Sequence, residues 1–151
     1  MQKTLYTIGY EGITVQAFIR ALKDAGVKTL IDVRAVPMSR KPGFSKNKLA
    51  GFLADAGIGY LGLRGLGTPA AGRDAARKGR VKEMHKIFRA HMKTKEAKED
   101  LAAAIDTAQK TKSCLLCFEH DARTCHRLLI ADDIAASTGM KVRHLDPQLP
   151  L

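Results

Sequence analysis

The sequence predicts an α/β fold, a single three-layer domain with a mostly parallel sheet of about five strands and helices on both faces. Short, nearly continuous apolar runs alternate along the chain with stretches in which apolar residues recur every three or four positions. Such runs are typical of strands buried on both faces, and strand–helix–strand units build parallel sheets with right-handed crossovers. With 151 residues, 45% of them hydrophobic, the chain suits one domain over residues 1–151.

The expected strands end at glycine, proline or polar turn residues. They cover residues 3–10, 27–33, 58–63, 112–118 and 142–145. The first strand ends at Gly9, with Gly12 in a tight turn after it, and the second runs into Arg34. Residues 35–44 hold two prolines and a glycine, which suit neither a strand nor a helix, so they predict a loop.

The expected helices are marked by capping residues as well as by apolar periodicity. Thr14 and Gly26 cap the first helix, and Ser45 and Gly57 bound the second. Later helices are expected over 81–88, 101–108 and 124–137, with 93–100 either a polar link or part of one continuous helix. The glycine-rich stretch from Gly62 to about Arg80 predicts a long irregular segment.

The positive charge of the chain is concentrated in one segment. The formal net charge is +11, and residues 34–95 hold fifteen Lys or Arg against three Asp or Glu, a net of +12. The rest of the chain therefore nets −1. A basic segment of this kind attracts phosphate-rich partners through its summed field. The alternative is a solvated surface without such a partner.

Composition also bears on where the protein works. No charged-then-apolar leader precedes Leu5, and no apolar run approaches the ~18 residues that cross a bilayer. Three cysteines are an odd number and too few for a disulfide scaffold, which favours a reducing compartment. We therefore expect a cytoplasmic protein with no membrane partner.

Polar residues follow several of the expected strands. The carboxyl ends of parallel strands share one edge of the sheet, where ligands bind. The residues expected to meet there are Asp32, Glu119, Cys125 and His126 as candidate catalytic groups, Arg34, Ser39, Arg40 and Arg127 as anion-binding groups, and Gly9, Tyr10, Pro37 and Cys117 as pocket lining. Asp32 and Arg34 share strand parity, so they can face the same side as an ion pair. Cys125 lies at an expected helix start, whose partial positive charge favours anions and depresses a thiol pKa.

Several short segments carry a resemblance to a known family. They are Thr7-Ile8-Gly9, Asp32-Val33-Arg34 with Pro37 and Ser39, Phe44, Leu66-Gly67, Cys117-Phe118-Glu119 and Cys125-His126-Arg127. As an ordered set over nearly the whole chain, they resemble the signature of the domain-of-unknown-function family 488. The family has His-Ser where this chain has Tyr10-Glu11, so no acid–base role of that histidine carries over. The resemblance implies an intracellular prokaryotic α/β domain and no known reaction.

The cysteines admit more than one kind of chemistry. Cys114 and Cys117 match C-x-x-C, but residues three apart on a strand point to opposite faces, so they should share neither a metal nor a disulfide. A zinc site from Cys117, Cys125 and His126 is disfavoured, since neighbours on a helix diverge by about 100°. A redox pair of Cys117 and Cys125 requires close approach of their Cβ atoms. We therefore expect no metal and no cofactor, and the thiol pair stays open.

Three functions fit these features. The first is an enzyme or enzyme-like protein that binds an anionic ligand, a nucleotide or nucleic acid, at the sheet edge. The second is a non-catalytic, basic nucleic-acid-binding module, and the third is a thiol-dependent sulfurtransferase or redox protein that uses Cys125 or Cys117. A cysteine phosphatase is disfavoured because the loop between Cys117 and Arg123 contains no glycine. The structural alternative is a set of ion pairs that only fix loops to the sheet edge.

Overall fold

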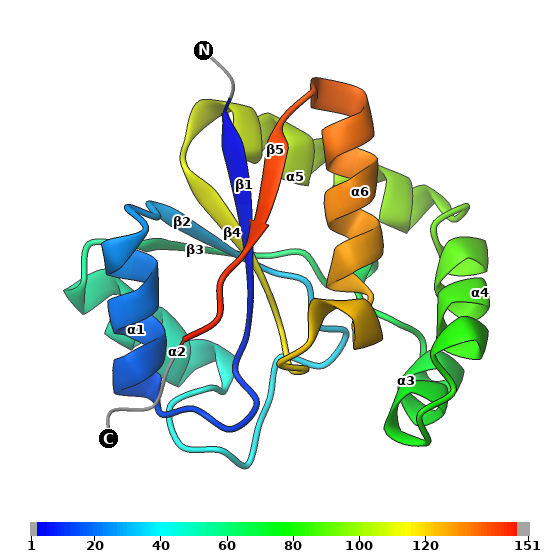
Figure 1. Cartoon of the computed structure of the whole chain (residues 1–151), viewed down its shortest axis with the longest axis horizontal. Helices are drawn as coiled ribbons and strands as arrows, with labels where there is room; N and C mark the ends of the chain where they lie inside the picture. Colours follow the sequence, from blue (N-terminus) through cyan, green and yellow to red (C-terminus); the bar gives the residue numbers. More distant parts are fainter. Residues whose placement is uncertain (1–2, 148–151) are drawn as a thin grey trace.

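The structure, a computed structural model, describes residues 3–147, and this part of the chain contains a sheet of five parallel strands (Figure 1). The strands are β1 Thr4–Gly9, β2 Thr29–Asp32, β3 Gly59–Gly62, β4 Ser113–Cys117 and β5 Lys141–His144. They are ordered β3-β2-β4-β1-β5, and each neighbouring pair is parallel. The predicted parallel α/β sheet is confirmed.

Helices cover both faces of this sheet (Figure 1). They are α1 Val15–Asp24, α2 Lys46–Asp55, α3 Ala70–Arg77, α4 Val81–His91, α5 Lys95–Lys110 and α6 Arg127–Thr138, with the short 3₁₀-helices η1 Arg64–Leu66 and η2 Ala122–Thr124. The connections through α1 and α2 step toward the β3 edge, whereas those through α5 and α6 step back toward β5. Because crossovers between parallel strands are right-handed, opposite steps place their helices on opposite faces, which gives three layers.

Each face of the sheet has its own hydrophobic core. α1 and α2 pack on one face, and α4, α5 and α6 pack on the other. The central strand β4 contributes to both cores, with Cys114 and Leu116 on the first face and Leu115 and Cys117 on the second. Cys114 and Cys117 therefore point to opposite faces, as strand periodicity predicts.

The segment expected to be irregular after Gly62 contains a helix, α3. Alanine is its only apolar residue type, so no stripe of larger side chains marks this helix in the sequence. α3 packs on α4 as a helical hairpin at one end of the molecule (Figure 1). Gly72 faces Ile87 of α4, whose Cγ2 would lie 3.3 Å from an added Cβ, and that Cβ would also collide with Thr68 Cγ2 just before α3. Tertiary contact, rather than local periodicity, supports this helix.

The starts of α5 and α6 test two predictions about where helices begin. α4 and α5 are separate helices, because Thr94 caps the second through a 3.2 Å hydrogen bond from Ala97 N to its Oγ1. The helix expected over 124–137 begins only at Arg127. Cys125, just before it, is extended, with φ −124° and ψ 145°. Cys125 and its neighbour His126 thus lie in a turn ahead of the helix.

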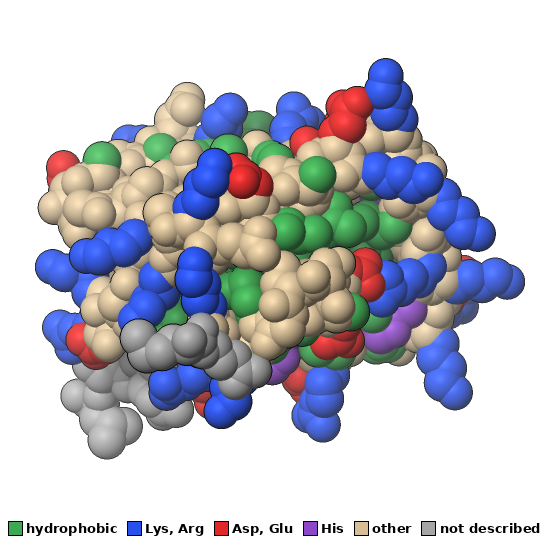
Figure 2. Space-filling view, turned by 90° about the horizontal axis from the view of Figure 1, so that it is seen from above, with side chains coloured by type: hydrophobic (Ala, Val, Ile, Leu, Met, Phe, Trp, Pro, Cys, Tyr) green, Lys and Arg blue, Asp and Glu red, His purple; other side chains and the backbone are tan. Residues whose placement is uncertain are grey.

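Positive charge is spread around one face of the molecule, the face at which β1 begins. Figure 2 looks down from the top of Figure 1, onto the edge at which β1 begins, and shows Lys and Arg side chains projecting around the outline of this face. On this face they surround a less charged centre and do not form one patch. No helix within residues 3–147 is long and apolar enough to span a membrane.

Candidate functional site

A cavity of about 220 Å³ lies at the carboxyl edge of the sheet. Five residues with polar or sulfur-containing side chains at this edge of the sheet line the cavity. They are Tyr10 after β1, Arg34 after β2, Cys117 and Glu119 at the end of β4, and His126 before α6. These are residues that the sequence predicts at one site although they are far apart along the chain. The parallel sheet brings them together because all its strands end on the same side.

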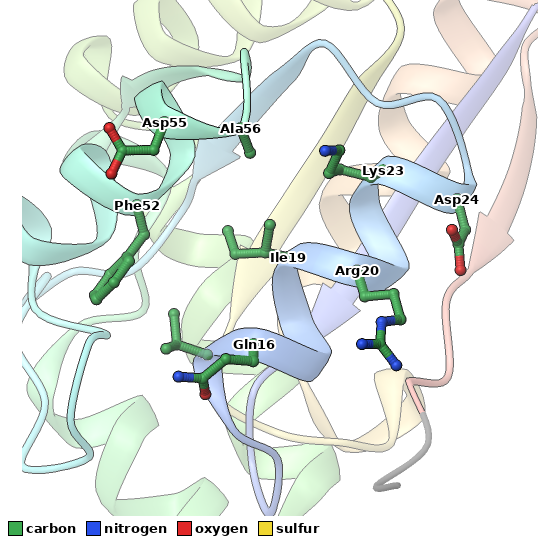
Figure 3. A pocket seen from close by; sticks show the side chains of 9 residues that line it. Gln16, Ile19, Arg20, Lys23, Asp24, Phe52, Asp55 and Ala56 are labelled. Atoms are coloured by element: carbon green, nitrogen blue, oxygen red, sulfur yellow. The ribbon is translucent and has the colours of Figure 1, made fainter.

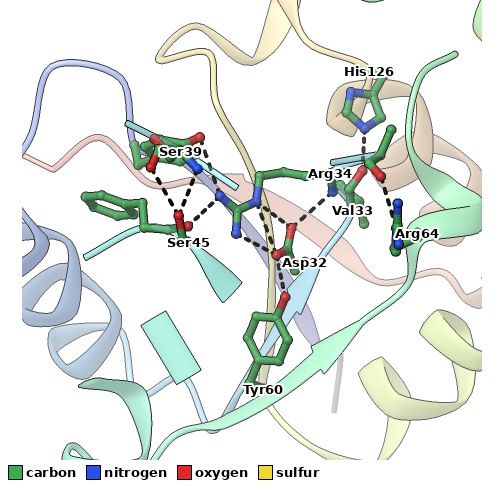
Figure 4. Close-up of polar contacts among 11 residues, drawn as sticks. Asp32, Val33, Arg34, Ser39, Ser45, Tyr60, Arg64 and His126 are labelled. Atoms are coloured by element: carbon green, nitrogen blue, oxygen red, sulfur yellow. Dashed lines mark hydrogen bonds and ion pairs between the residues drawn. The ribbon is translucent and has the colours of Figure 1, made fainter. Parts of the chain in front are cut away.

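Asp32 and Arg34 form a buried ion pair beside this cavity (Figure 4). Arg34 donates from Nε to Asp32 Oδ1 at 2.9 Å and from Nη2 to Oδ2 at 2.8 Å. Tyr60 Oη donates a third hydrogen bond to Oδ2, at 2.6 Å. Burial alone lowers the pKa of Arg34, but its hydrogen bonds to Asp32 and the charge of that carboxylate raise the pKa above its ordinary value. The pair predicted from strand parity is present, and Asp32 is fully engaged in it.

Aromatic rings fix the position of Arg34 at the cavity wall. The ring of Tyr10 lies under the guanidinium, with Cζ of Arg34 5.4 Å from the ring centroid. Tyr10 stacks on Phe44 at 4.5 Å and meets Phe118 edge-on at 5.3 Å. Arg34 Nη1 also donates to the carbonyl of Phe44 at 2.6 Å. The guanidinium is therefore held rigidly, with its charge beside the cavity.

Cys117, Cys125 and His126 converge at the floor of the site. One sulfur or ring nitrogen from each lies within 4.8 Å of the other two, and all three residues are buried. The two sulfur atoms are in direct contact, as in a disulfide, while the Cα atoms are 7.4 Å apart. The expectation that Cys125 and His126 diverge along a helix is wrong, because α6 starts one residue after them.

His126 is held in one orientation by the backbone of the β2 end. Its Nε2 lies 2.8 Å from the carbonyl oxygen of Val33 (Figure 4), and its Nδ1 lies 3.7 Å from Cys125 Sγ. Burial lowers the pKa of His126 to about 4 despite the hydrogen bond to Val33. The imidazole is therefore neutral at pH 7. Since a carbonyl only accepts, Nε2 carries the hydrogen and the lone pair of Nδ1 faces the sulfur.

Arg127 lies behind this floor and does not line the cavity. It is fully buried and donates to Thr7 Oγ1 at 3.1 Å, to the carbonyl of Glu119 at 2.5 Å and to the carbonyl of His120 at 3.1 Å. Burial lowers its pKa. Gly9 belongs to the same contact, because a Cβ there would collide with the carbonyl of Glu119. Arg127 and Gly9 thus seat the loop after β4 against β1.

The carboxylate of Glu119 lines the cavity, with Oε2 3.4 Å from Cys117 Sγ. Burial raises its pKa, and the nearby charge of Arg127 only partly opposes this. Arg127 contacts the main-chain oxygen of Glu119 instead of its carboxylate. The carboxylate is therefore placed to interact with whatever occupies the cavity.

The remaining predicted residues lie in the loop between β2 and α2. Ser39 Oγ accepts from Lys41 N at 3.1 Å, and the main-chain atoms of Ser39 bond to Ser45 Oγ (Figure 4). The carbonyl of Pro37 accepts from Lys46 N at 2.9 Å. Arg40 is exposed. None of Pro37, Ser39 and Arg40 lines the cavity, so this loop is organised around the start of α2.

The α3–α4 hairpin and the residue Thr68 before it close the other side of the cavity, and sequence reasoning missed these residues. They are Thr68, Arg73, Ala76, Arg77 and Met84. Arg73 and Arg77 are four residues apart on α3, so they share one helix face. That spacing, directly after a proline suited to a helix start, is the signal in the sequence that could have found them.

A larger hollow of about 530 Å³ lies between α1 and α2 (Figure 3). Ile19 of α1 and Phe52 of α2 line it, together with charged residues such as Arg20 and Asp55. It contains no residue of the predicted site. The smaller cavity at the sheet edge, where cysteine, histidine, carboxylate and arginine side chains meet, is therefore the candidate site.

Comparison with known families gives a match that covers most of this site. A family whose description reads "Domain of unknown function DUF488" matches residues 14–134. The match includes every residue of the cavity lining except Tyr10. No match was found among curated proteins or among solved structures.

Proposed function

Because this chain belongs to the DUF488 family, whose description assigns no activity, we propose a function from its own site: the protein binds a nucleotide-class anion in the sheet-edge cavity. The observation that carries this proposal is the convergence of Arg34, Arg73 and Arg77 on one cavity. Glu119 is the acidic residue among the lining side chains, so three arginines leave the lining net positive. Guanidinium groups bind phosphate through paired, charge-assisted hydrogen bonds.

The two arginines of α3 are available to a ligand. Within residues 3–147, Arg73 donates from Nη1 to the carbonyl of Thr68 at 3.0 Å, and no carboxylate pairs with its guanidinium. Arg77 lies 3.8 Å from Asp74, at an exposed position where such a pair contributes little. An anion can therefore recruit both side chains without breaking a buried ion pair.

The size and mouth of the cavity favour a nucleotide end. Its volume of about 220 Å³ is smaller than the roughly 300–1,000 Å³ of sites that enclose drug-sized ligands. At the mouth, Val36 and Phe118 are 46% and 47% exposed. A phosphate can sit among the arginines while a base stacks on the exposed ring of Phe118. This arrangement suits a mononucleotide or the end of a single strand better than a duplex.

Calorimetry with a nucleoside monophosphate, inorganic phosphate and the free nucleoside tests the proposal. Arg73→Ala should weaken monophosphate binding by about 10-fold or more, as expected for loss of a charge-assisted phosphate contact. The matched control is Lys82→Ala, which removes one charge from the adjoining α4 outside the cavity. Phe118→Ala should weaken binding of the monophosphate while leaving inorganic phosphate unchanged.

A different result would favour the basic-module alternative. If Arg73→Ala and Lys82→Ala weaken binding equally, and affinity falls steeply with salt, the summed field and not the cavity attracts the anion. The proposed pocket would then be rejected.

A further inference from the structure

We propose that Cys117, Cys125 and His126 form a zinc site at the floor of the cavity. The three ligands come from two places in the fold: Cys117 from the end of β4, and Cys125 and His126 from the turn between η2 and α6. Zinc is the metal that thiolate and neutral imidazole ligands favour together. This inference goes beyond anion binding and does not depend on it.

The first support is the compactness of the cluster. The two sulfurs and the imidazole nitrogen lie within 4.8 Å of one another. In a tetrahedral site with zinc–sulfur bonds of about 2.3 Å and zinc–nitrogen bonds of about 2.0 Å, ligand atoms are roughly 3.5–3.8 Å apart. His126 Nδ1 already lies 3.7 Å from Cys125 Sγ, whereas the two sulfurs are in direct contact and would move apart to reach that spacing around a metal ion. Cys117 and Cys125 are each 1% exposed, so water does not compete freely for the sulfurs.

The second support is the orientation of the histidine. Its Nε2–H donates to the carbonyl of Val33 at 2.8 Å, which leaves the Nδ1 lone pair directed at Cys125 Sγ. Metal-binding histidines are usually held in this way, with the distal ring nitrogen donating to a carbonyl or carboxylate. The end of β2 therefore supplies the outer contact that fixes the tautomer required of a ligand.

The third support is the environment of the sulfurs. Arg127 donates from Nη1 to Cys117 Sγ at 3.3 Å and from its backbone N to Cys125 Sγ at 3.5 Å. N–H donors and a buried cation stabilise thiolates, which is the form that binds zinc, and they act against the carboxylate of Glu119, whose Oε2 lies 3.4 Å from Cys117 Sγ. Two thiolates, one neutral imidazole and one divalent cation are neutral in sum, so the site places no uncompensated charge beside Arg127.

The backbone spacing separates a metal site from a disulfide. The Cα atoms of Cys117 and Cys125 are 7.4 Å apart, whereas disulfides usually join Cα atoms about 4.4–6.8 Å apart. Two thiolates on one zinc ion tolerate the wider spacing, because the metal lies between their sulfurs. The three protein ligands leave a fourth coordination position, and it opens on the cavity because Cys117 and His126 line that cavity.

Metal analysis of the reduced, purified chain tests the proposal. We expect one zinc ion per chain by mass spectrometry of metal content, and a visible spectrum of tetrahedral, thiolate-ligated cobalt when Co²⁺ replaces zinc. Cys117→Ser, Cys125→Ser and His126→Asn should each lower zinc affinity by about 10-fold or more, because each removes a ligand. The matched control is Cys114→Ala, which removes the remaining thiol from the opposite face of the sheet and should keep the full metal content.

The wild-type measurements stand even if a ligand variant fails to fold. A reduced chain that binds neither Zn²⁺ nor Co²⁺ overturns the proposal. An intact mass two hydrogens below that of the fully reduced chain, with no bound metal, would overturn it in favour of a Cys117–Cys125 disulfide. If the reduced chain binds no metal but still binds the anion, the zinc proposal would fail while the proposed anion-binding function stands.

Discussion

The carboxylate of Asp32 holds the guanidinium of Arg34 in a bidentate, buried ion pair at the end of β2. Asp32 is 1% exposed and Arg34 6%, so neither charge is screened by bulk water. The pair keeps Arg34 charged and rigid at the cavity wall without a ligand. An anion that binds there meets a preorganised cation and loses little free energy in ordering it.

Replacing Asp32 with asparagine should destabilise the protein strongly, because it leaves Arg34 as a buried cation without a carboxylate. Removing one partner of a buried ion pair lowers the free energy of unfolding by about 3–5 kcal/mol. Because the asparagine amide has the same shape as the carboxylate, we expect a loss toward the lower end of this range. Urea unfolding measures the change. The control is Asp121→Asn, which removes a carboxylate from the exposed pair with Arg123 and should have little effect. Equal losses in the two variants would contradict a structural role for the Asp32 charge.

Gly9→Ala and Gly51→Ala should have opposite effects on stability. A Cβ at Gly9 would collide with the carbonyl of Glu119, which is backbone and cannot move aside cheaply, so we expect a loss of about 1–3 kcal/mol. Gly51 lies within α2 with no atom within 4 Å of an added Cβ, so alanine should stabilise the helix by about 0.5–1 kcal/mol. Thermal unfolding of both variants tests the contrast, and a stabilising Gly9→Ala would refute the close approach.

Arg127→Lys should loosen the loop that follows β4. A lysine is a point charge without the planar fork that lets Arg127 reach Thr7 and the carbonyls of Glu119 and His120 together. Hydrogen exchange should therefore accelerate over residues 118–121. The amides of α1, on the other face of the sheet, serve as the internal control. Acceleration spread evenly over both regions would indicate general destabilisation instead of a local role.

Cys114 should resist alkylation in the folded protein. Burial raises the pKa of its thiol far above the usual range, although the charge of Arg127 lowers it in part. The group stays a protonated, inaccessible thiol as pH rises through 8 and 9, where an ordinary cysteine of pKa about 8.5 becomes a thiolate. Peptide mass spectrometry after iodoacetamide treatment measures this, with the denatured chain as the reference. Rapid labelling of Cys114 in the native state would contradict its placement.

The cysteine and histidine cluster shows where reasoning from the sequence stops. A helix start at Thr124 would make Cys125 and His126 diverge, but η2 and an extended Cys125 delay the helix to Arg127. The delay turns the two side chains toward Cys117. Helix boundaries are set by a few competing hydrogen bonds, here including one from Arg123 N to Asp121 Oδ1 at 2.9 Å, which no apolar periodicity encodes.

The sequence by itself determined the alternation of strands and helices, the parallel sheet and the Asp32–Arg34 pair, because each depends on local periodicity or strand parity. The tertiary structure decided the strand order, the burial of Arg127 and the contribution of Arg73 and Arg77 to the cavity. α3 illustrates the reason. It is short, with alanine as its only apolar residue type, and its packing on α4 places its arginines over the sheet edge. Packing between segments distant in sequence depends on the shapes of both surfaces, and that information is absent from either segment alone.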